Sequence, residues 1–364
     1  MRMKKQLLIL LAAIGFSNTI YGQAPKYSNE FLSIGVGADA LAMSNAFIAK
    51  SNNVTSGYWN PAGLNRIKSN MQIGYMHNEY FAGIAKYDYG ALASRIDATT
   101  VIGFTPLLRL GVDDIPDTSE LIDNNGNINY DRVKSFSAAD YAFIFSYAKQ
   151  TSIEGLSYGA NAKLIHRKVG EFGNAWGFGL DAGIQYNLDK WQFAAMGRDI
   201  TSTFNAWSFN TEKFQDVFTI TGNEIPANSL EITLPKLILG IGRTIDFSDK
   251  LSLYPEIDLD ITFDGMRNVL IKSDPISIDP HMGVELGYNE FAFLRLGIGN
   301  IQQITNFDYS KSTVLQPNMG LGIKLKSFSI DYALTNIGQT TGLLSNVFSL
   351  VLDINKKSIK EEQN

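Results

Sequence analysis

The sequence contains no cysteine. Disulfide bonds, thiolate catalysis, thiolate metal sites and a lipid-anchored N-terminal cysteine are therefore excluded. Charged residues are also scarce, because Lys, Arg, Asp and Glu make up only 18% of the 364 residues, and the formal net charge is −5. Nucleic-acid-binding proteins usually carry a basic surface, so this composition argues against a nucleic acid as a partner.

Glycine and aromatic residues, by contrast, are plentiful. The chain has 32 Gly, 22 Phe and 16 Tyr, and aromatic residues account for 12% of it. Glycine allows tight turns, and aromatic side chains favour strands. This combination is typical of a β-protein with many turns.

The first residues have the parts of an export signal. MRMKK at 1–5 is basic, LLILLAAIGF at 7–16 is apolar, and Gly22 offers a small residue for cleavage. We interpret residues 1–22 as a signal peptide. A membrane anchor is the alternative, but the apolar run is shorter than the ~18 residues that a transmembrane helix needs, and no later run reaches that length.

Residues 174–188, NAWGFGLDAGIQYNL, alternate between two kinds of side chain. From 176 to 188 the even positions are apolar, and glycine or polar residues lie between them. Successive side chains of a strand point to opposite faces, so the pattern predicts a long strand with one apolar face and one small or polar face. The same alternation recurs in residues 251–264, 318–325 and 327–335.

Counting all such segments predicts about fourteen strands. The expected spans are 70–78, 83–96, 98–110, 136–150, 155–169, 174–188, 190–199, 234–247, 251–264, 277–289, 291–300, 315–326, 327–336 and 342–354. Longer loops are expected at 111–135, 200–233, 265–276, 301–314 and 337–341. These loops largely alternate with short turns, as the outer loops and periplasmic turns of outer-membrane barrels do.

Two architectures could produce this pattern: a soluble β-sandwich and a transmembrane β-barrel. Glu256, Asp258 and Asp260 share one face of a predicted strand. Burying three carboxylates in a dry sandwich core would be very costly, whereas a polar lumen tolerates them. We therefore predict an all-β fold: a transmembrane antiparallel β-barrel of about fourteen strands, embedded in the lipid of the cell outer membrane.

The three acids are expected to meet basic residues across the lumen and to form a charge ladder. Carboxylate pairs can also be catalytic. However, no pairing of a nucleophile with a base can be identified, so no enzyme is predicted. The candidate lumen charges are Glu256, Asp258, Asp260, Lys163, Arg167, Arg295 and Lys324.

Residues 23–69 do not alternate in this way and precede the barrel at 70–354, which is followed by a polar tail at 355–364. We expect the segment to form a plug inside the barrel, because a large barrel otherwise encloses a channel. Within SGYWNPAGL at 56–64, Asn60 can cap a short helix that begins at Pro61. Tyr58 and Trp59 would then pack against the barrel wall.

Two motifs in this segment are similar to those of a known family. Gly37, Ala38, Ala40, Leu41, Met43, Ala46, Phe47 and Ala49 match its small-residue run, and Tyr58, Trp59, Asn60, Pro61, Ala62, Gly63 and Leu64 match its YWNPAGL motif. Ser44 and Asn45 depart from the glycines common at those positions. The chain thus resembles the PorV/PorQ-like branch of the FadL-type outer-membrane superfamily.

This resemblance implies a component of type IX protein secretion, a system of Bacteroidota. PorV-type members bind the sorting domains of secreted cargo and associate with the translocon, so these are the partners implied. A FadL-type transporter of hydrophobic small molecules is the alternative, and it needs an apolar internal pocket. A barrel that serves only membrane integrity or surface display is a third possibility.

Other apparent motifs carry little weight. The three histidines, His77, His166 and His281, lie on separate predicted strands, which favours lumenal or interfacial roles over metal binding or catalysis. GVGADA at 35–40 lacks the βαβ context of a dinucleotide site. DNNGNINYD at 123–131 lacks the EF-hand spacing and is interpreted as a solvated turn. No cofactor or metal is predicted.

Overall fold

The computed structural model describes residues 28–118, 120–121, 126–212, 215, 224, 227–335 and 344–355. The predicted signal peptide, nearly all of the polar tail and the loop expected at 337–341 lie outside these ranges. Within them, no helix has the length and apolar character needed to cross a bilayer.

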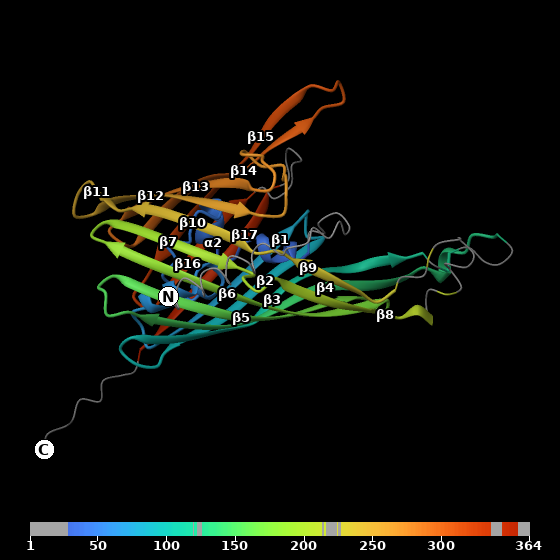
Figure 1. The fold of residues 1–364 in the computed structure, drawn as a ribbon, viewed down its shortest axis with the longest axis horizontal. Helices are drawn as coiled ribbons and strands as arrows, with labels where there is room; N and C mark the ends of the chain where they lie inside the picture. Colours follow the sequence, from blue (N-terminus) through green and yellow to red (C-terminus); the bar gives the residue numbers. More distant parts are fainter. Residues whose placement is uncertain are drawn as a thin grey trace, which may run out of the picture.

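One antiparallel sheet contains all seventeen strands of the described residues, and pairing of β1 with β17 closes it into a barrel (Figure 1). The strands of its first half are β1 (Met71–Tyr80), β2 (Ala85–Arg95), β3 (Thr100–Asp117), β4 (Lys134–Gln150), β5 (Leu156–Val169), β6 (Gly173–Leu188), β7 (Trp191–Arg198) and β8 (Thr203–Phe209). The others are β9 (Ser229–Thr233), β10 (Lys236–Arg243), β11 (Ile245–Asp246), β12 (Leu251–Thr262), β13 (Ser277–Tyr288), β14 (Ala292–Thr305), β15 (Lys311–Lys324), β16 (Phe328–Thr335) and β17 (Ser345–Ile354).

These seventeen segments form a barrel of fourteen strands, as predicted, because two of the barrel strands are interrupted and each consists of two or three segments. β7 and β8 both pair with β6, one along each half of it. β8 then pairs with β9, and β7 pairs with β10. β7 and β8 are therefore two parts of one barrel strand, and β9 and β10 are two parts of the next. β11 follows β10 in the same barrel strand and, like β10, pairs with β12.

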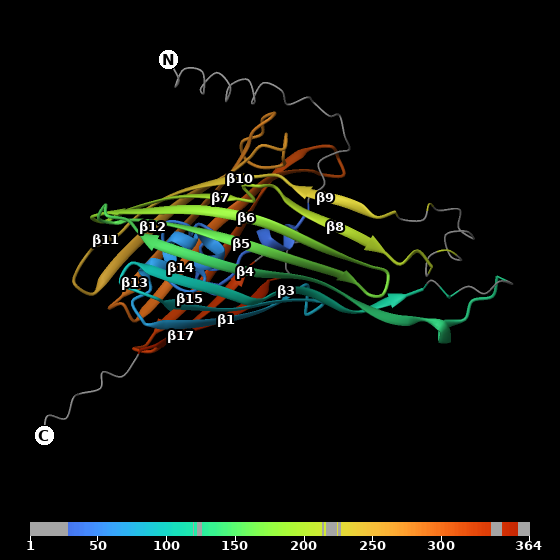
Figure 2. The same ribbon diagram turned by 60° about the horizontal axis from the view of Figure 1, so that its bottom comes forward.

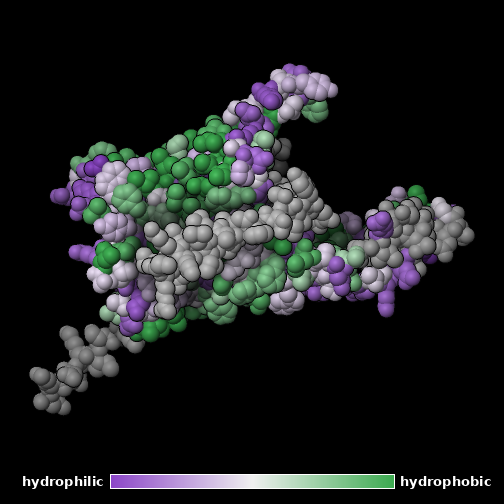
Figure 3. Space-filling model, viewed as in Figure 1, coloured by the Kyte–Doolittle hydropathy of each residue, from purple (hydrophilic) through white to green (hydrophobic). Residues whose placement is uncertain are grey.

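The outer wall of the barrel is apolar. In β6, Trp176, Phe178 and Ile184 are 42 to 50% exposed, while Gly177, Gly179 and Gly183 on the other face are buried. Figure 3 shows a broad apolar surface on the face of the barrel in view. The alternation of the sequence therefore places its apolar side toward lipid, and this confirms the transmembrane barrel.

The long connections contain more strand than the sequence predicts. β3 extends to Asp117 and β4 begins at Lys134, so a hairpin with a short helix, η3 (Tyr130–Arg132), replaces much of the loop expected at 111–135. β8 and β9 lie within the expected loop 200–233, and β14 and β15 shorten the one at 301–314. In the β3–β4 and β14–β15 hairpins, alternation is absent because both faces meet water beyond the membrane. β8 differs, because its inward residues Thr203 and Asn205 are buried. The β3–β4 hairpin projects far from the barrel (Figures 1 and 2).

Residues 28–70, which we call the N-terminal segment, lie inside the barrel (Figure 2). The segment comprises η1 (Glu30–Ser33), α2 (Ala38–Ala42), α3 (Ser56–Trp59) and η2 (Pro61–Arg66). α2 contacts β14 to β17, and η2 contacts β3 to β6, which lie on another part of the wall. The segment therefore connects distant strands of the barrel across its lumen.

Candidate functional site: the barrel interior

Inward-facing glycines line the wall around the N-terminal segment. A Cβ atom on any of eight of them would lie within about 3 Å of a segment atom, which is closer than real Cβ contacts generally allow. They are Gly74, Gly103, Gly159, Gly183, Gly240, Gly283, Gly297 and Gly320. Their strands are spread around the barrel, so the wall is shaped to hold the segment. The sequence shows these glycines in its alternating pattern, but not that they contact the segment.

Two buried carboxylates of β12 bind four consecutive backbone amides of the N-terminal segment. Asp258 Oδ2 accepts hydrogen bonds from the amides of Phe47 and Ile48, at 2.8 and 3.1 Å. Glu256 accepts from the amides of Ala49 and Lys50, at 2.7 and 3.0 Å. Because both carboxylates are 1% exposed, these bonds replace hydration that burial removes.

The expected ladder between these acids and the predicted basic residues is therefore wrong. Glu256 and Asp258 bind backbone amides, and Asp260 pairs with Lys236 at 2.7 Å. The sequence identifies which residues share a face, but it fixes neither the register of neighbouring strands nor the path of the N-terminal segment. The lumenal location of the three acids is nevertheless correct.

The predicted basic residues have other partners. Lys163, which is 4% exposed, lies 2.7 Å from Asp181 and 2.6 Å from Asp199, at the interruption between β7 and β8. Three further cations complete the set: Arg167 pairs with Asp140 and Glu231, Arg295 pairs with Glu285 and Asp331, and Lys324 is exposed at the end of β15. Lys50 of the N-terminal segment also pairs with Glu285.

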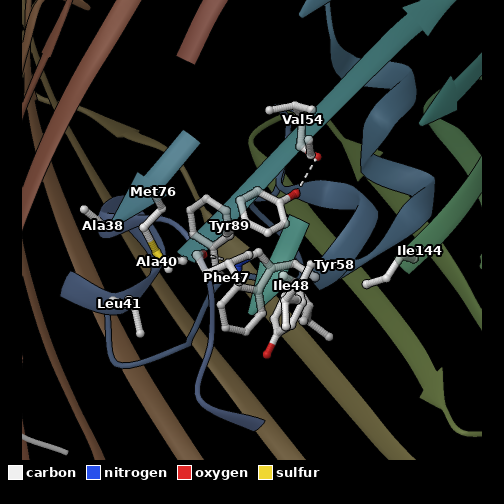
Figure 4. Close-up of a cluster of buried hydrophobic side chains, with 14 of the residues drawn as sticks. Ala38, Ala40, Leu41, Phe47, Ile48, Val54, Tyr58, Met76, Tyr89 and Ile144 are labelled. Carbon is white, nitrogen blue, oxygen red and sulfur yellow. Dashed lines mark hydrogen bonds between the residues drawn. The ribbon is translucent and has the colours of Figure 1, made fainter. Parts of the chain in front are cut away.

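Tyr58 and Trp59 are buried, and their helix α3 contacts β3 and β4 of the wall. They also bind within the N-terminal segment. Trp59 Nε1 donates to the carbonyl of Val36 at 2.8 Å, and the Tyr58 hydroxyl donates to that of Leu32 at 2.5 Å. On the wall, the guanidinium of Arg198 in β7 lies 4.6 Å from the Tyr58 ring centre. Figure 4 shows Tyr58 beside Ile48 in this cluster.

The rest of SGYWNPAGL behaves as its residue types predict. The Asn60 side chain accepts from the amide of Ala62 at 3.2 Å, which caps η2, and Pro61 is the first residue of that helix. A Cβ at Gly63 would lie 2.3 Å from the carbonyl oxygen of Ser51, so crowding requires glycine there. Ala62 and Leu64 are fully buried.

The small-residue run forms α2 and the turn after it. Its residues Gly37, Ala38, Ala40, Leu41, Met43, Ala46 and Phe47 are all buried. Ser44 and Asn45 have φ angles of 54° and 69°, in the left-handed region that glycine adopts most readily. This explains why glycine suits these positions. Burial raises the pKa of the Asp39 carboxyl within α2, against the opposing effect of the Arg295 guanidinium.

A cavity of about 490 Å³ lies between the N-terminal segment and the wall. Residues at the loop ends of β10, β12, β13, β14 and β15 line it, so it lies on the side of the longer connections, which is the outer side in such barrels. Its charged lining residues are Glu30, Arg198, Lys236, Asp260, Arg267 and Asp279. The apolar ones include Ile34, Leu41, Trp59 and Ile238.

Only one of the three histidines lines this cavity. His281 has its Nδ1 2.9 Å from the carbonyl oxygen of Ser44 and its Nε2 3.8 Å from Asp279. His77 pairs with Asp88 at 2.7 Å, and His166 lies against the Trp176 ring at 4.2 Å. Among the described residues, no group of three or more potential ligands is placed to hold a metal ion.

No protein-family model matches the chain, and no curated protein matches it. Several solved structures do. One is CymD, a monoaromatic hydrocarbon channel, with a TM-score of 0.54 and 14% identity over 89% of this chain and 98% of that one. Another is the toluene transporter TodX of P. putida, with a TM-score of 0.51 and 15% identity over 88% of this chain and 99% of that one. A third is the toluene transporter TbuX of Ralstonia pickettii, with a TM-score of 0.50 and 13% identity over 88% of this chain and 99% of that one. The chain thus has the fold of the FadL-type outer-membrane barrels.

Proposed function

We propose that this protein is a FadL-type outer-membrane transporter that admits small molecules from the cell surface to the cavity beside its N-terminal segment. The cavity carries the proposal. At about 490 Å³ it has the size of an ordinary small-molecule site, and it lies toward the longer connections of the barrel. Similar structures include a monoaromatic hydrocarbon channel and toluene transporters.

In this proposal the N-terminal segment is the plug that limits free permeation. Its contacts with the glycine-lined wall and with Glu256 and Asp258 favour a segment that stays in place. A ligand would rest against the apolar residues Ile34, Leu41 and Ile238, with its polar atoms toward the charged and amide side chains. Such a lining suits molecules with a polar part better than a pure hydrocarbon.

Solute flux into proteoliposomes tests this function. The panel contains toluene, laurate and the neutral disaccharide maltose, and wild type is compared with Gln316→Trp, which fills the cavity from β15. We expect at least one solute to enter faster than into empty liposomes, and the substitution to abolish the gain. No gain for any solute, or a gain that survives Gln316→Trp, would refute the proposal.

The second candidate is a docking role in type IX protein secretion. The projecting β3–β4 hairpin favours it, because Ile128 and Tyr130 near its tip are 60% and 74% exposed. At the tip of the β14–β15 hairpin, Phe307 and Tyr309 are almost fully exposed as well. Exposed aromatic residues on projecting hairpins suit contact with a translocon subunit or a cargo sorting domain.

A pull-down from detergent-solubilised outer membranes tests this candidate. The bait is the full chain, and the control is the double variant Phe307→Ser and Tyr309→Ser. Specific recovery of a translocon subunit or of cargo, lost in the control, is the expected result. Recovery of neither with the wild-type bait would remove the docking role.

A further inference from the structure

The charges that line the cavity nearly balance. Three cations, Arg198, Lys236 and Arg267, are matched by Glu30, Asp260 and Asp279. Two cations are also paired with carboxylates at close range, because Lys236 lies 2.7 Å from Asp260 and Arg267 forms a bidentate pair with Asp264. With Asp264 included, four carboxylates face three cations, so the lining does not attract an anionic ligand.

Side-chain amides make up much of the rest of the lining. Gln302 Nε2 donates to Asn300 Oδ1 at 2.5 Å, and Asn300 Nδ2 donates to Gln316 Oε1 at 3.1 Å. This row crosses from β14 to β15. Asn318 follows on β15 and donates to Ser44 Oγ of the N-terminal segment at 2.7 Å. An amide has two donor hydrogens and two acceptor lone pairs, so the row can both donate to and accept from a ligand.

The cavity also has an aromatic side chain. Trp59 lines it, held in position by the bond from its indole Nε1 to Val36. An aromatic ring beside amide groups can contact the apolar C–H face of a molecule while the amides bind its hydroxyl groups. A hydrocarbon at the same place would displace water from the amides without replacing its hydrogen bonds, at a cost of about 1–3 kcal/mol for each buried group.

We propose that the cavity binds an uncharged, hydroxyl-rich ligand of the carbohydrate class. This inference rests on the proposed function, because it names the chemical class of the molecule admitted. The hydroxyl groups of a sugar are neutral and can both donate and accept, as can the amides of Asn300, Gln302 and Gln316. The sugar could be free in solution or form the head of a glycolipid, since both present the same hydroxyl groups.

Calorimetric titration of the purified full chain tests the inference. The detergent is lauryldimethylamine oxide, because glycosidic detergents would compete. The ligands are maltose for a free sugar, octyl glucoside for a sugar on an alkyl chain, laurate and toluene. The variants are Asn300→Leu and Gln316→Leu. Asn346→Leu, an exposed amide on β17, is the matched control. A folded barrel is verified in each variant by its shifted mobility on unheated SDS gels.

We expect maltose or octyl glucoside to bind the wild-type chain. Its affinity for Asn300→Leu and for Gln316→Leu should be at least tenfold lower, and its affinity for Asn346→Leu should be unchanged. Binding of maltose assigns a free sugar, and binding of octyl glucoside alone assigns a sugar head on a lipid. Binding of laurate or toluene without either sugar would overturn the inference and leave the proposed transport intact. Sugar binding that is insensitive to both variants would also overturn it. If no ligand binds and the flux panel is silent, both proposals fail.

Discussion

Asp258 Oδ2 on β12 accepts a hydrogen bond from the backbone amide of Phe47 in the N-terminal segment, at 2.8 Å. The two residues are 211 positions apart in the sequence, and both are buried. With Glu256 beside it, Asp258 joins the segment to the barrel through four consecutive amides. The position of the segment in the lumen therefore depends on two acidic side chains of one strand.

Replacing either carboxyl group by an amide is expected to loosen this attachment. Asp258→Asn and Glu256→Gln keep the side-chain shape but put an NH2 group in place of one acceptor oxygen, so each variant should lose about 2 kcal/mol of unfolding free energy. Urea unfolding of the refolded barrel in detergent measures the loss. Glu290→Gln, in the exposed turn between β13 and β14, is the control and should behave as wild type.

A side chain at Gly297 is expected to displace the N-terminal segment. Its Cβ would lie 2.3 Å from the backbone carbonyl carbon of Met43, and backbone cannot move aside as a flexible side chain can. Gly297→Ala should therefore raise the ionic conductance in planar bilayers. At Gly90 on β2 the nearest atom, Leu107 Cβ, would be 3.4 Å away, so Gly90→Ala is the control. Equal conductance in the two variants would contradict close packing of segment and wall.

Replacing Trp59 or Pro61 should loosen the segment without preventing insertion of the barrel. Trp59→Ala removes the bond to Val36 and the ring contact with Tyr58, and truncation of a buried tryptophan typically costs about 3–5 kcal/mol. Single-channel recordings should show a larger or noisier current. Trp176→Ala, on the lipid-facing side of β6, is the control. Recordings identical to wild type in both Trp59→Ala and Pro61→Ala would refute a sealing role.

Lys163 is expected to be essential for the interruption between β7 and β8. Lys163→Met leaves the carboxylates of Asp181 and Asp199 buried without their cation, and breaking a buried ion pair in this way costs about 3–5 kcal/mol. Adding Asp181→Asn and Asp199→Asn to Lys163→Met should recover part of the loss, because the repelling charges are removed. Unfolding by urea distinguishes the variants. A single variant as stable as wild type would show that the cluster is not structural.

The barrel itself is predictable from the sequence because its physical cause is local. Alternation in segments such as 174–188 directly reports which side of a strand faces lipid, and β6 occupies nearly the same residues. The strand ends beyond the membrane are not predictable in this way. β3 and β4 continue past the membrane as a hairpin whose side chains are half-buried or exposed on both faces, so no alternation is required of them.

The interior is less predictable because it depends on contacts between residues far apart in the sequence. The acids of β12 are visible as a same-face set, but their partners are backbone amides that no side-chain pattern reveals. The amides of Asn300, Gln302 and Gln316 come together only through the register of β14 and β15, which contains a bulge between Gly299 and Gln302. The sequence does indicate one interior feature. Ser44 and Asn45 stand where the similar motif has glycine, and both have left-handed φ angles.

The most direct test of the account is the reactivity of single cysteines in a chain that has none of its own. Ser33→Cys places a thiol on the cavity lining, and Ser56→Cys places one within the buried part of the N-terminal segment. A membrane-impermeant maleimide is added to intact cells. We expect rapid labelling of Ser33→Cys and, until the protein is denatured, almost none of Ser56→Cys. Equal labelling of both, or labelling of Ser33→Cys only after the periplasm is opened, would contradict a cavity that faces the cell surface and is closed by the segment.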